Sequence, residues 1–437
     1  MTGIQECVLY RGFEKGEILD KMTELMDVLD DHPSEIQKYR SVFYQCVNGL
    51  LETAGSYGFS GNLWHNYLTL LLVNHENAFS TACEIRGARE GTINDFALHD
   101  FSIFKKLYDF DLTAFDKVFQ TSCCRKLCSY QAPENTGKMF NKRIRDRICQ
   151  MSRTLAMAEN TEEFMKDMVQ FYKDFGVGKL GLHKAFRVEH DKDGQVAIVP
   201  VTRIAHVRLE DLVGYEIPKQ KLIANTEAFV QGRKANNCLL FGDAGTGKSS
   251  SIKGILNRYY EDGLRIIEIY KHQFQDLNDV IAQIKDRNYK FIIYMDDLSF
   301  EEFEIEYKYL KAVIEGGLER KPDNILIYAT SNRRHLVRER AGDKLELSDE
   351  DDLHSSDTVQ EKLSLVYRFG ERIYFGAPDR KEFQNIVKVL AKRHGIEMPE
   401  KQLLLEAGQW ELSHGGLTGR TAQQFIDHLL GRGEGKQ

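Results

Sequence analysis

The stretch Cys238-Leu239-Leu240-Phe241-Gly242-Asp243-Ala244-Gly245-Thr246-Gly247-Lys248-Ser249 decides the fold. A short apolar strand runs directly into the phosphate-binding pattern Gly-x-x-x-x-Gly-Lys-Ser, and an amphipathic helix is expected directly after it. Glycines let the backbone wrap tightly so that consecutive amides point at phosphate oxygens, and the N-terminus of the helix adds a partial positive charge. A chance glycine-rich turn would not need the strand, the Lys-Ser pair and the helix together. The sequence therefore predicts a nucleoside triphosphate site.

The residues of this loop have expected roles. Lys248 should reach the β- and γ-phosphates, and the hydroxyl of Ser249 should ligate Mg²⁺. The residues expected to contact the nucleotide here are Gly242, Asp243, Ala244, Gly245, Thr246, Gly247, Lys248, Ser249 and Ser250.

A second apolar strand, residues 291–295, ends in the paired acids Asp296 and Asp297. Asp296 is expected to hold the Mg²⁺ shell together with Ser249, and Asp297 to orient or deprotonate the attacking water. Because Asp is one methylene shorter than the Glu usual at the second position, hydrolysis could be slow, or a nearby acid could reach in instead. The candidates for that substitution are Glu301 and Glu302. The alternative is that the two aspartates only cap a turn.

From about residue 205 the sequence alternates between strand and helix patterns, which is typical of an α/β layer fold. The earlier part carries apolar residues at three- and four-residue spacing, which indicates amphipathic helices. A hairpin is expected between them, around the turn Asp191–Gly194. We therefore predict a helical N-terminal domain at 1–182, a hairpin or linker at 183–204, an α/β core at 205–376 and a C-terminal helical lid at 377–437.

The phosphate loop and the Asp296-Asp297 strand resemble the Walker A and Walker B elements of the AAA+ ATPases. Asn332, after the strand 325–329, is similar to their sensor 1, which implies a place between the γ-phosphate and the lytic water. The segment Val213-Gly214-Tyr215 resembles the part that packs on adenine. Arg368 lies in a segment similar to the arginine finger, and Arg420 matches the sensor 2 arginine at the start of a lid helix.

The resemblance covers residues 205–432 well and the N-terminal half only loosely. In particular, the chain resembles a bacterial family of predicted AAA+ ATP-binding proteins of unknown function, with which it shares strings such as Asp-Leu-Val-Gly-Tyr-Glu and Asp-Asp-Leu-Ser-Phe-Glu. This implies a P-loop AAA+ core with a five-stranded parallel sheet, and ATP and Mg²⁺ as ligands.

The resemblance also implies a ring-like homo-oligomer in which Arg368 of one subunit senses the γ-phosphate bound by its neighbour. Arg333 and Arg334 are rival candidates for that role. Hydrolysis would then drive remodelling of a macromolecular partner. A protein client is expected, and the helical N-terminal half would be the part that recognises it.

Two other functions remain open. The first is a non-hydrolysing switch or adaptor that ATP holds in a binding-competent shape, which the short side chain of Asp297 allows. The second is a small-molecule P-loop kinase, which is disfavoured by the sensor-like Asn332 and by the helical lid. The acidic stretch 342–357 is expected to be a mobile loop because its like charges repel, with partner docking as the alternative.

Composition and charge exclude some functions and indicate the cellular compartment. The net charge is −7, which excludes a polycationic DNA coat. The basic stretch 138–147 is a weak indication of nucleic-acid binding, and a solvated helix face is the favoured interpretation. No run reaches the length of a membrane span, and the N-terminus has no secretory pattern. We therefore expect a cytoplasmic protein without a membrane segment, and reduced cysteines in place of disulfides.

A second glycine pattern, Gly176-Val177-Gly178-Lys179-Leu180-Gly181, matches the dinucleotide-binding motif Gly-x-Gly-x-x-Gly. It follows a helical pattern, and strand-like residues come after it. The strand-to-helix context that would direct these glycines at a pyrophosphate is missing, so a hinge between domains is favoured.

Overall fold

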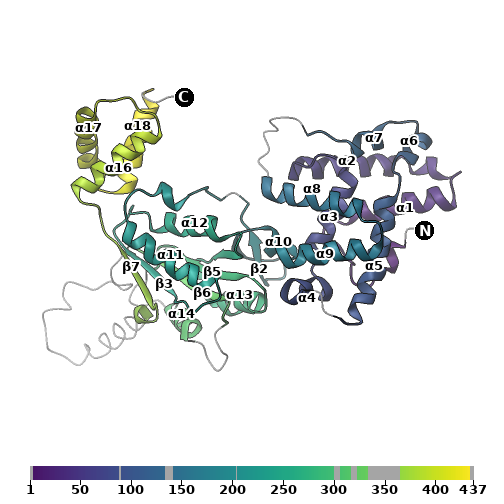
Figure 1. Cartoon of the computed structure of the whole chain (residues 1–437), viewed down its shortest axis with the longest axis horizontal. Helices are drawn as coiled ribbons and strands as arrows, with labels where there is room; N and C mark the ends of the chain where they lie inside the picture. Colours follow the sequence, from purple (N-terminus) through teal and green to yellow (C-terminus); the bar gives the residue numbers. More distant parts are fainter. Residues whose placement is uncertain are drawn as a thin grey trace. The chain divides into compact units, whose positions relative to one another are not determined.

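The structure is a computed structural model that describes residues 3–87, 90–132, 141–202, 204–299, 306–315, 322–332 and 365–433. The chain divides into two compact units, Met1–His183 and Lys184–Gln437, which Figure 1 draws in purple to blue and in teal to yellow. Four of the sequence predictions lie outside the described residues: Glu301, Glu302, the pair Arg333-Arg334 and the acidic stretch 342–357.

The described part of the first unit consists of helices. They are η1 (Ile4–Glu6), α1 (Glu17–Asp31), η2 (Ile36–Tyr39), α2 (Arg40–Tyr57), α3 (Leu63–Asn74), α4 (Ala78–Arg86), α5 (Ile93–Asp109), α6 (Thr113–Phe119), α7 (Cys123–Cys128), α8 (Lys142–Met157), α9 (Thr161–Phe175) and α10 (Gly178–Leu182). Helix α3 is buried on nearly every side, whereas α1, α5, α8 and α9 have one apolar face each. Helix α3 therefore lies inside the core of this unit, and the apolar faces of the other helices contribute to the same core.

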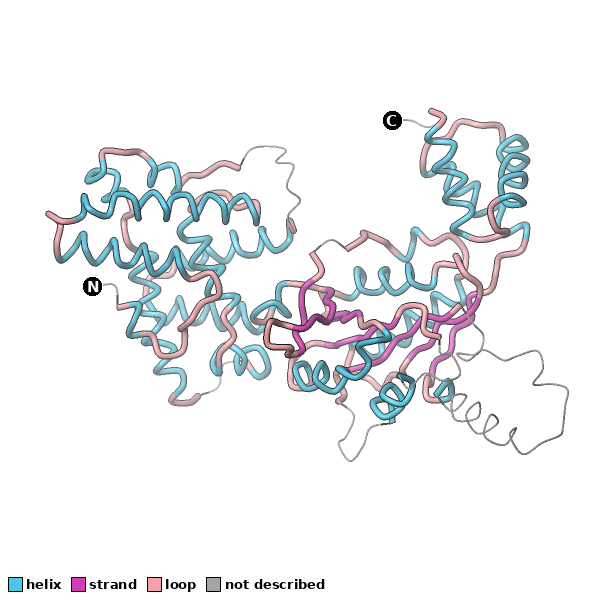
Figure 2. Tube along the Cα trace, turned by 180° about the vertical axis from the view of Figure 1, so that it is seen from behind, coloured by secondary structure: helices cyan, strands magenta, loops and turns pink. Residues whose placement is uncertain are grey.

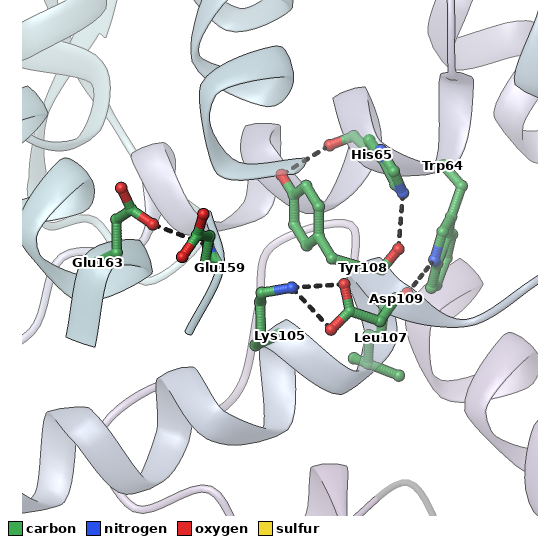
Figure 3. A network of polar contacts seen from close by, with 8 residues as sticks. All are labelled: Trp64, His65, Lys105, Leu107, Tyr108, Asp109, Glu159 and Glu163. Carbon is green, nitrogen blue, oxygen red and sulfur yellow. Dashed lines mark hydrogen bonds and ion pairs between the residues drawn. The ribbon is translucent and has the colours of Figure 1, made fainter. Parts of the chain in front are cut away.

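The first turn of α3 completes the hydrogen bonding at the end of α5 (Figure 3). The last carbonyls of a helix have no partner within the helix. Trp64 Nε1 donates to the carbonyl of Leu107 at 2.9 Å, and His65 Nε2 donates to the carbonyl of Tyr108 at 2.8 Å. Burial lowers the pKa of His65, so the imidazole serves here as a neutral donor.

The described part of the second unit contains a seven-stranded sheet in the order β2-β1-β4-β5-β6-β3-β7 (Figure 2, magenta). Its strands are β1 (Ala185–His190), β2 (Val196–Pro200), β3 (Cys238–Gly242), β4 (Leu264–Glu268), β5 (Lys290–Met295), β6 (Ile325–Ser331) and β7 (Glu371–Phe375). All neighbouring pairs are parallel except β1 with β2.

The number of strands corrects the sequence prediction. The five expected parallel strands are present, but the hairpin β1–β2 extends the same sheet and raises the total to seven. Strand β1 pairs with β4, with Phe186 opposite Ile267. Phe186 and Val188 are buried, so one face of the hairpin continues the core. The hairpin thereby covers the edge of β4, which would otherwise expose unpaired backbone groups.

Helices cover both faces of this sheet. They are η3 (Leu209–Asp211), α11 (Glu216–Val230), α12 (Lys248–Tyr259), η4 (Lys271–Asp276), α13 (Leu277–Ile284) and α14 (Glu306–Glu315). Helices α11 and α12 bury Leu222, Phe229, Ile252 and Ile255 against one face, in a single cluster with residues of β3, β4, β5, β6 and β7. Helices α13 and α14 lie on the opposite face (Figures 1 and 2). This is the predicted α/β core.

The predicted helical lid follows β7. It consists of α16 (Arg380–Arg393), α17 (Glu400–Ser413) and α18 (Gly419–Gly431), which share a core of their own around Phe383, Val387 and Phe425. Asp379 and Glu382 form a capping box at the start of α16, and Thr418 caps α18 by accepting from the amide of Thr421. Across the described residues, no helix combines the length and the apolar character needed to cross a bilayer.

Candidate nucleotide-binding site

The carboxyl ends of β3, β5 and β6 meet at one edge of the sheet, and the sequence motifs end there. Neighbouring parallel strands place their carboxyl ends together, so the phosphate loop, the acid pair and Asn332 converge. A cavity of about 670 Å³ lies at this edge, between the core and the lid. Its lining combines loop residues 244–251, the acids Asp296 and Asp297, and residues of α16 and α18.

The phosphate loop needs its glycines. Gly242, Gly245 and Gly247 have φ values of 130°, 75° and 89°, in the region that favours glycine. A Cβ on Gly242 would lie 2.2 Å from the carbonyl oxygen of Phe375, so no other residue fits between β3 and β7 at that point. Asp243 links the loop to the segment after β7, because its Oδ2 accepts from the amide of Ala377 at 2.7 Å.

Lys248 begins α12 and is buried, with 5% of its surface exposed. Its Nζ donates to the carbonyls of Gly242 at 3.0 Å and Asp243 at 2.6 Å. Burial lowers the pKa of Lys248, while the nearby carboxylates of Asp243 and Asp297 act in the opposite direction. The ammonium is therefore folded onto the loop whose amides would surround a phosphate.

One oxygen of Asp296 accepts three hydroxyl groups. The donors to Oδ1 are Tyr294 at 2.6 Å, Thr330 at 2.5 Å and Ser249 at 2.8 Å. Burial raises the pKa of Asp296, but these hydrogen bonds together outweigh it and the net shift is downward. Asp296 is therefore an ionised carboxylate beside a serine hydroxyl, a pair of oxygen ligands that suits Mg²⁺.

Asp297 has a strained backbone and two polar neighbours. Its φ is 50°, which is uncommon for a residue with a side chain and often marks a functional position. Its amide donates to Thr330 Oγ1 at 2.9 Å, and its Oδ1 accepts from Asn332 Nδ2 at 2.8 Å. Thr330 thus connects the two acids, and Asn332 lies beside the second.

The other end of the cavity is more apolar. Leu212, Val213 and Tyr215 line it from the core, and Ile386 and Leu390 line it from α16 of the lid. Tyr215 adopts a left-handed conformation with φ of 60°, and its ring lies 5.7 Å from that of Phe375. A flat aromatic base fits such a surface better than a phosphate does.

The lid reaches the phosphate loop through the start of α18. The amide of Arg420 donates to the carbonyl of Gly245 at 3.1 Å, and a Cβ on Gly245 would lie 3.1 Å from Thr418 Oγ1. The side chain of Arg420 lines the cavity. A cation at the N-terminus of a helix is unfavourable unless an anion compensates it, so its place here indicates an anionic ligand.

The structure brings most of the predicted residues to this cavity. The exceptions are Gly214, Gly242 and Asp243, which shape the loops around it, and Arg368. Arg368 precedes β7 and therefore lies at the amino edge of the sheet, opposite the cavity. Arg368 could therefore take part in catalysis only at the cavity of a neighbouring chain.

Several lining residues were not predicted from the sequence. They are Asp211, Leu212, Lys219, Ser251, Thr330, Ile386, Leu390, Gly419, Gln423 and Gln424. Thr330 could have been predicted, because it lies on β6 two residues before Asn332, which follows the strand. Gln424 could also have been predicted, because it lies one helical turn after Arg420 and therefore on the same face of the helix.

The fold and the site define the class of protein: a P-loop AAA+ core with a helical lid. The chain belongs to the family described as "Protein of unknown function (DUF815)", whose model matches residues 181–433. No curated protein has a matching sequence.

Among solved structures, the chain is similar to a RuvB mutant of Thermotoga maritima, with 16% identity over 53% of this chain and 68% of that chain and a TM-score of 0.37. It is also similar to the AAA domain of FIGL-1 in complex with ADP, with 16% identity over 52% of this chain and 75% of that chain and a TM-score of 0.36.

Proposed function

We propose that this chain is an ATPase that couples the hydrolysis of ATP with Mg²⁺ to the remodelling of a macromolecular partner. The observation that carries the proposal is one continuous polar network across three strand ends. It runs from Ser249 to Asp296, through Thr330 to Asp297, and on to Asn332. It lies on the wall of a cavity that also contains the phosphate loop and Arg420.

The residues present fit a magnesium ion. Ser249 Oγ and Asp296 Oδ1 are 2.8 Å apart, and the lowered pKa of Asp296 keeps it ionised at neutral pH. When bound, Mg²⁺ would neutralise charge on the β- and γ-phosphates. Tyr294 and Thr330 hold the same carboxylate oxygen from the strands, so its position does not depend on a ligand.

The chain's own residues have distinct tasks in such a site. Lys248 and the loop amides would bind the phosphates, and Arg420 would approach them from the lid. Asp297 would accept a hydrogen bond or a proton from water, and the amide of Asn332 would hold that carboxylate or the water in place. The apolar end of the cavity would receive the adenine.

Assembly belongs to the same proposal. Because Arg368 lies away from the cavity of its own chain, it is suited to reach the γ-phosphate held by a neighbouring subunit in a ring. The helical unit would recognise a protein client. All eight cysteines are free thiols, which supports the reducing cytoplasm as the compartment.

The first experiment measures binding and turnover on the full chain. Calorimetry with ATP and Mg²⁺ should show binding to the wild type and to Asp297→Asn, whereas phosphate release should fall by at least about tenfold in the variant. Absence of binding heat in the wild type would contradict a nucleotide site. Binding without phosphate release, with or without client proteins, would contradict the ATPase.

That last outcome is the second candidate function, a switch that binds ATP without hydrolysing it. The observation that favours it is the conformation of Asp297, which has a strained backbone and a short side chain that is already hydrogen-bonded to Asn332. A carboxylate held in this way is less available to a water molecule.

The second experiment addresses assembly. Arg368→Ala should leave ATP affinity unchanged within about twofold, and it should reduce turnover of the assembled protein by about 10³-fold, the loss typical of a missing arginine finger. Sizing with and without ATP and Mg²⁺ supplies the matching readout. Normal hydrolysis by the assembled variant would show that Arg368 is not the finger.

A further inference from the structure

The segment Glu210–Val213 joins the core to the lid at the apolar end of the cavity. Leu212 packs against the core cluster, and its Cδ2 would lie 3.7 Å from a Cβ on Gly247 in the phosphate loop. Val213, the next residue, packs against the core of the lid. Both side chains also line the cavity. A ligand seated there therefore contacts a segment that belongs to both parts.

Cations from both parts hold the carbonyls of this segment. Arg393, at the end of α16, donates from Nη2 to the carbonyl of Glu210 at 2.8 Å and from Nη1 to that of Asp211 at 2.6 Å. Lys219, on α11, donates to the carbonyl of Leu212 at 2.7 Å and is itself paired with Glu216 at 2.8 Å. Hydrogen bonds from charged donors are among the stronger ones in proteins.

Helix α16 contributes to the cavity and to this contact from one face. Ile386, Leu390 and Arg393 follow one another at spacings of four and three residues, so they lie along the same side of the helix. The first two line the cavity, and Arg393 binds the carbonyls one turn further on. The guanidinium thus fixes the distance between the two walls that would enclose the base.

We infer that Arg393 is a positioning residue for the base of the nucleotide, and that it couples the position of the lid to base binding. This rests on the proposed function, because it takes the ligand to be an adenine nucleotide. Arg393 itself does not line the cavity, and it acts through Glu210 and Asp211. Its loss should therefore weaken contacts to the base while leaving those to the phosphates, which involve Lys248 and the loop amides.

The test compares ligands that share the phosphates but differ in the base. For Arg393→Gln in the full chain, the affinity for ATP and for ADP should fall by about five- to tenfold, a modest effect because Arg393 is exposed. The affinity for inorganic tripolyphosphate with Mg²⁺, measured by competition, should change by less than about twofold. Arg393→Lys should be intermediate, since one ammonium replaces a fork of two donors.

The matched control is Arg380→Gln, on the same helix. Arg380 is exposed and lies 3.9 Å from Glu411, within the lid and away from the cavity lining. All three affinities should stay at the wild-type values in this variant. Equal losses for ATP and tripolyphosphate in Arg393→Gln, or no loss for ATP, would overturn the inference. A wild type that does not bind ATP would instead contradict the proposed function, so the two failures are distinguishable.

Discussion

The chain contains two glycine-rich loops with a Gly-Lys pair, and only one of them borders the cavity. The loop Gly242–Ser249 follows strand β3, precedes a helix of twelve residues and lines the cavity with six of its eight residues. The loop Gly176–Gly181 follows helix α9 and runs into the five-residue helix α10, which begins at Gly178, and it is largely buried in the helical unit. Each glycine pattern matches a phosphate-binding motif, so the presence of such a motif alone does not separate them.

The second loop binds an anion too, but the anion is part of the chain. The amide of Val177 donates to Glu84 Oε2 at 2.8 Å, and Glu84 is buried. Gly178 has a φ of 69°, and a Cβ there would lie 2.0 Å from Oε1 of Glu76. Carboxylates thus lie where the turn presents its backbone. Both loops are rich in glycine, and the difference is that the surrounding fold already supplies carboxylates to the second one.

The largest difference between the two loops is expected at their lysines, Lys248 and Lys179. Lys248→Ala should weaken ATP binding by at least about 100-fold, because it removes a buried cation from the phosphate loop. Lys179→Ala should leave ATP affinity within about twofold of the wild type, because Lys179 is exposed and its loop is occupied by carboxylates. Calorimetry on both full-length variants gives the affinities.

Thermal unfolding of both variants is the accompanying control. Lys248 holds two carbonyls of its own loop, so a loss of binding has meaning only if the fold survives. Comparable losses of affinity in the two variants would show that the second loop takes part in nucleotide binding, contrary to this prediction.

The predictable parts of the site are those formed by consecutive residues of the sequence. Strand β3 with its loop, the acids after β5 and Asn332 after β6 each follow an apolar run, and a parallel sheet brings such strand ends together. Tyr294 was predicted only as a strand residue. Its hydroxyl bonds Asp296 because residues two apart share one face of a strand, and this pairing was readable in principle.

The remaining parts depend on long-range packing. Ile386, Leu390 and Arg393 reach the site only because the lid folds back on the core, and no local pattern gives that direction. The extension of the sheet by β1 likewise depends on pairing with β4, about 80 residues later in the chain. The loop Gly176–Gly181, for which a hinge is favoured by sequence, is buried and runs into α10, and its neighbours Glu76 and Glu84 lie far away in sequence.

The smallest expected effect concerns the second loop itself. Gly178→Ala should lower the free energy of unfolding by about 1–2 kcal/mol, because alanine is strained at positive φ and its Cβ displaces Glu76. Gly12→Ala is the matched control: its φ of 64° is similar, but no atom lies within 4 Å of the new Cβ. It should cost about 1 kcal/mol, from backbone strain alone.

Denaturant unfolding of the full chain measures both costs, and their difference reports the contact with Glu76. ATP affinity should be unchanged in both variants, since neither glycine lies in the unit that contains the cavity. If Gly178→Ala lowers ATP affinity while Gly12→Ala does not, the carboxylates do not simply fill the second loop. The second loop would then influence nucleotide binding at the first loop.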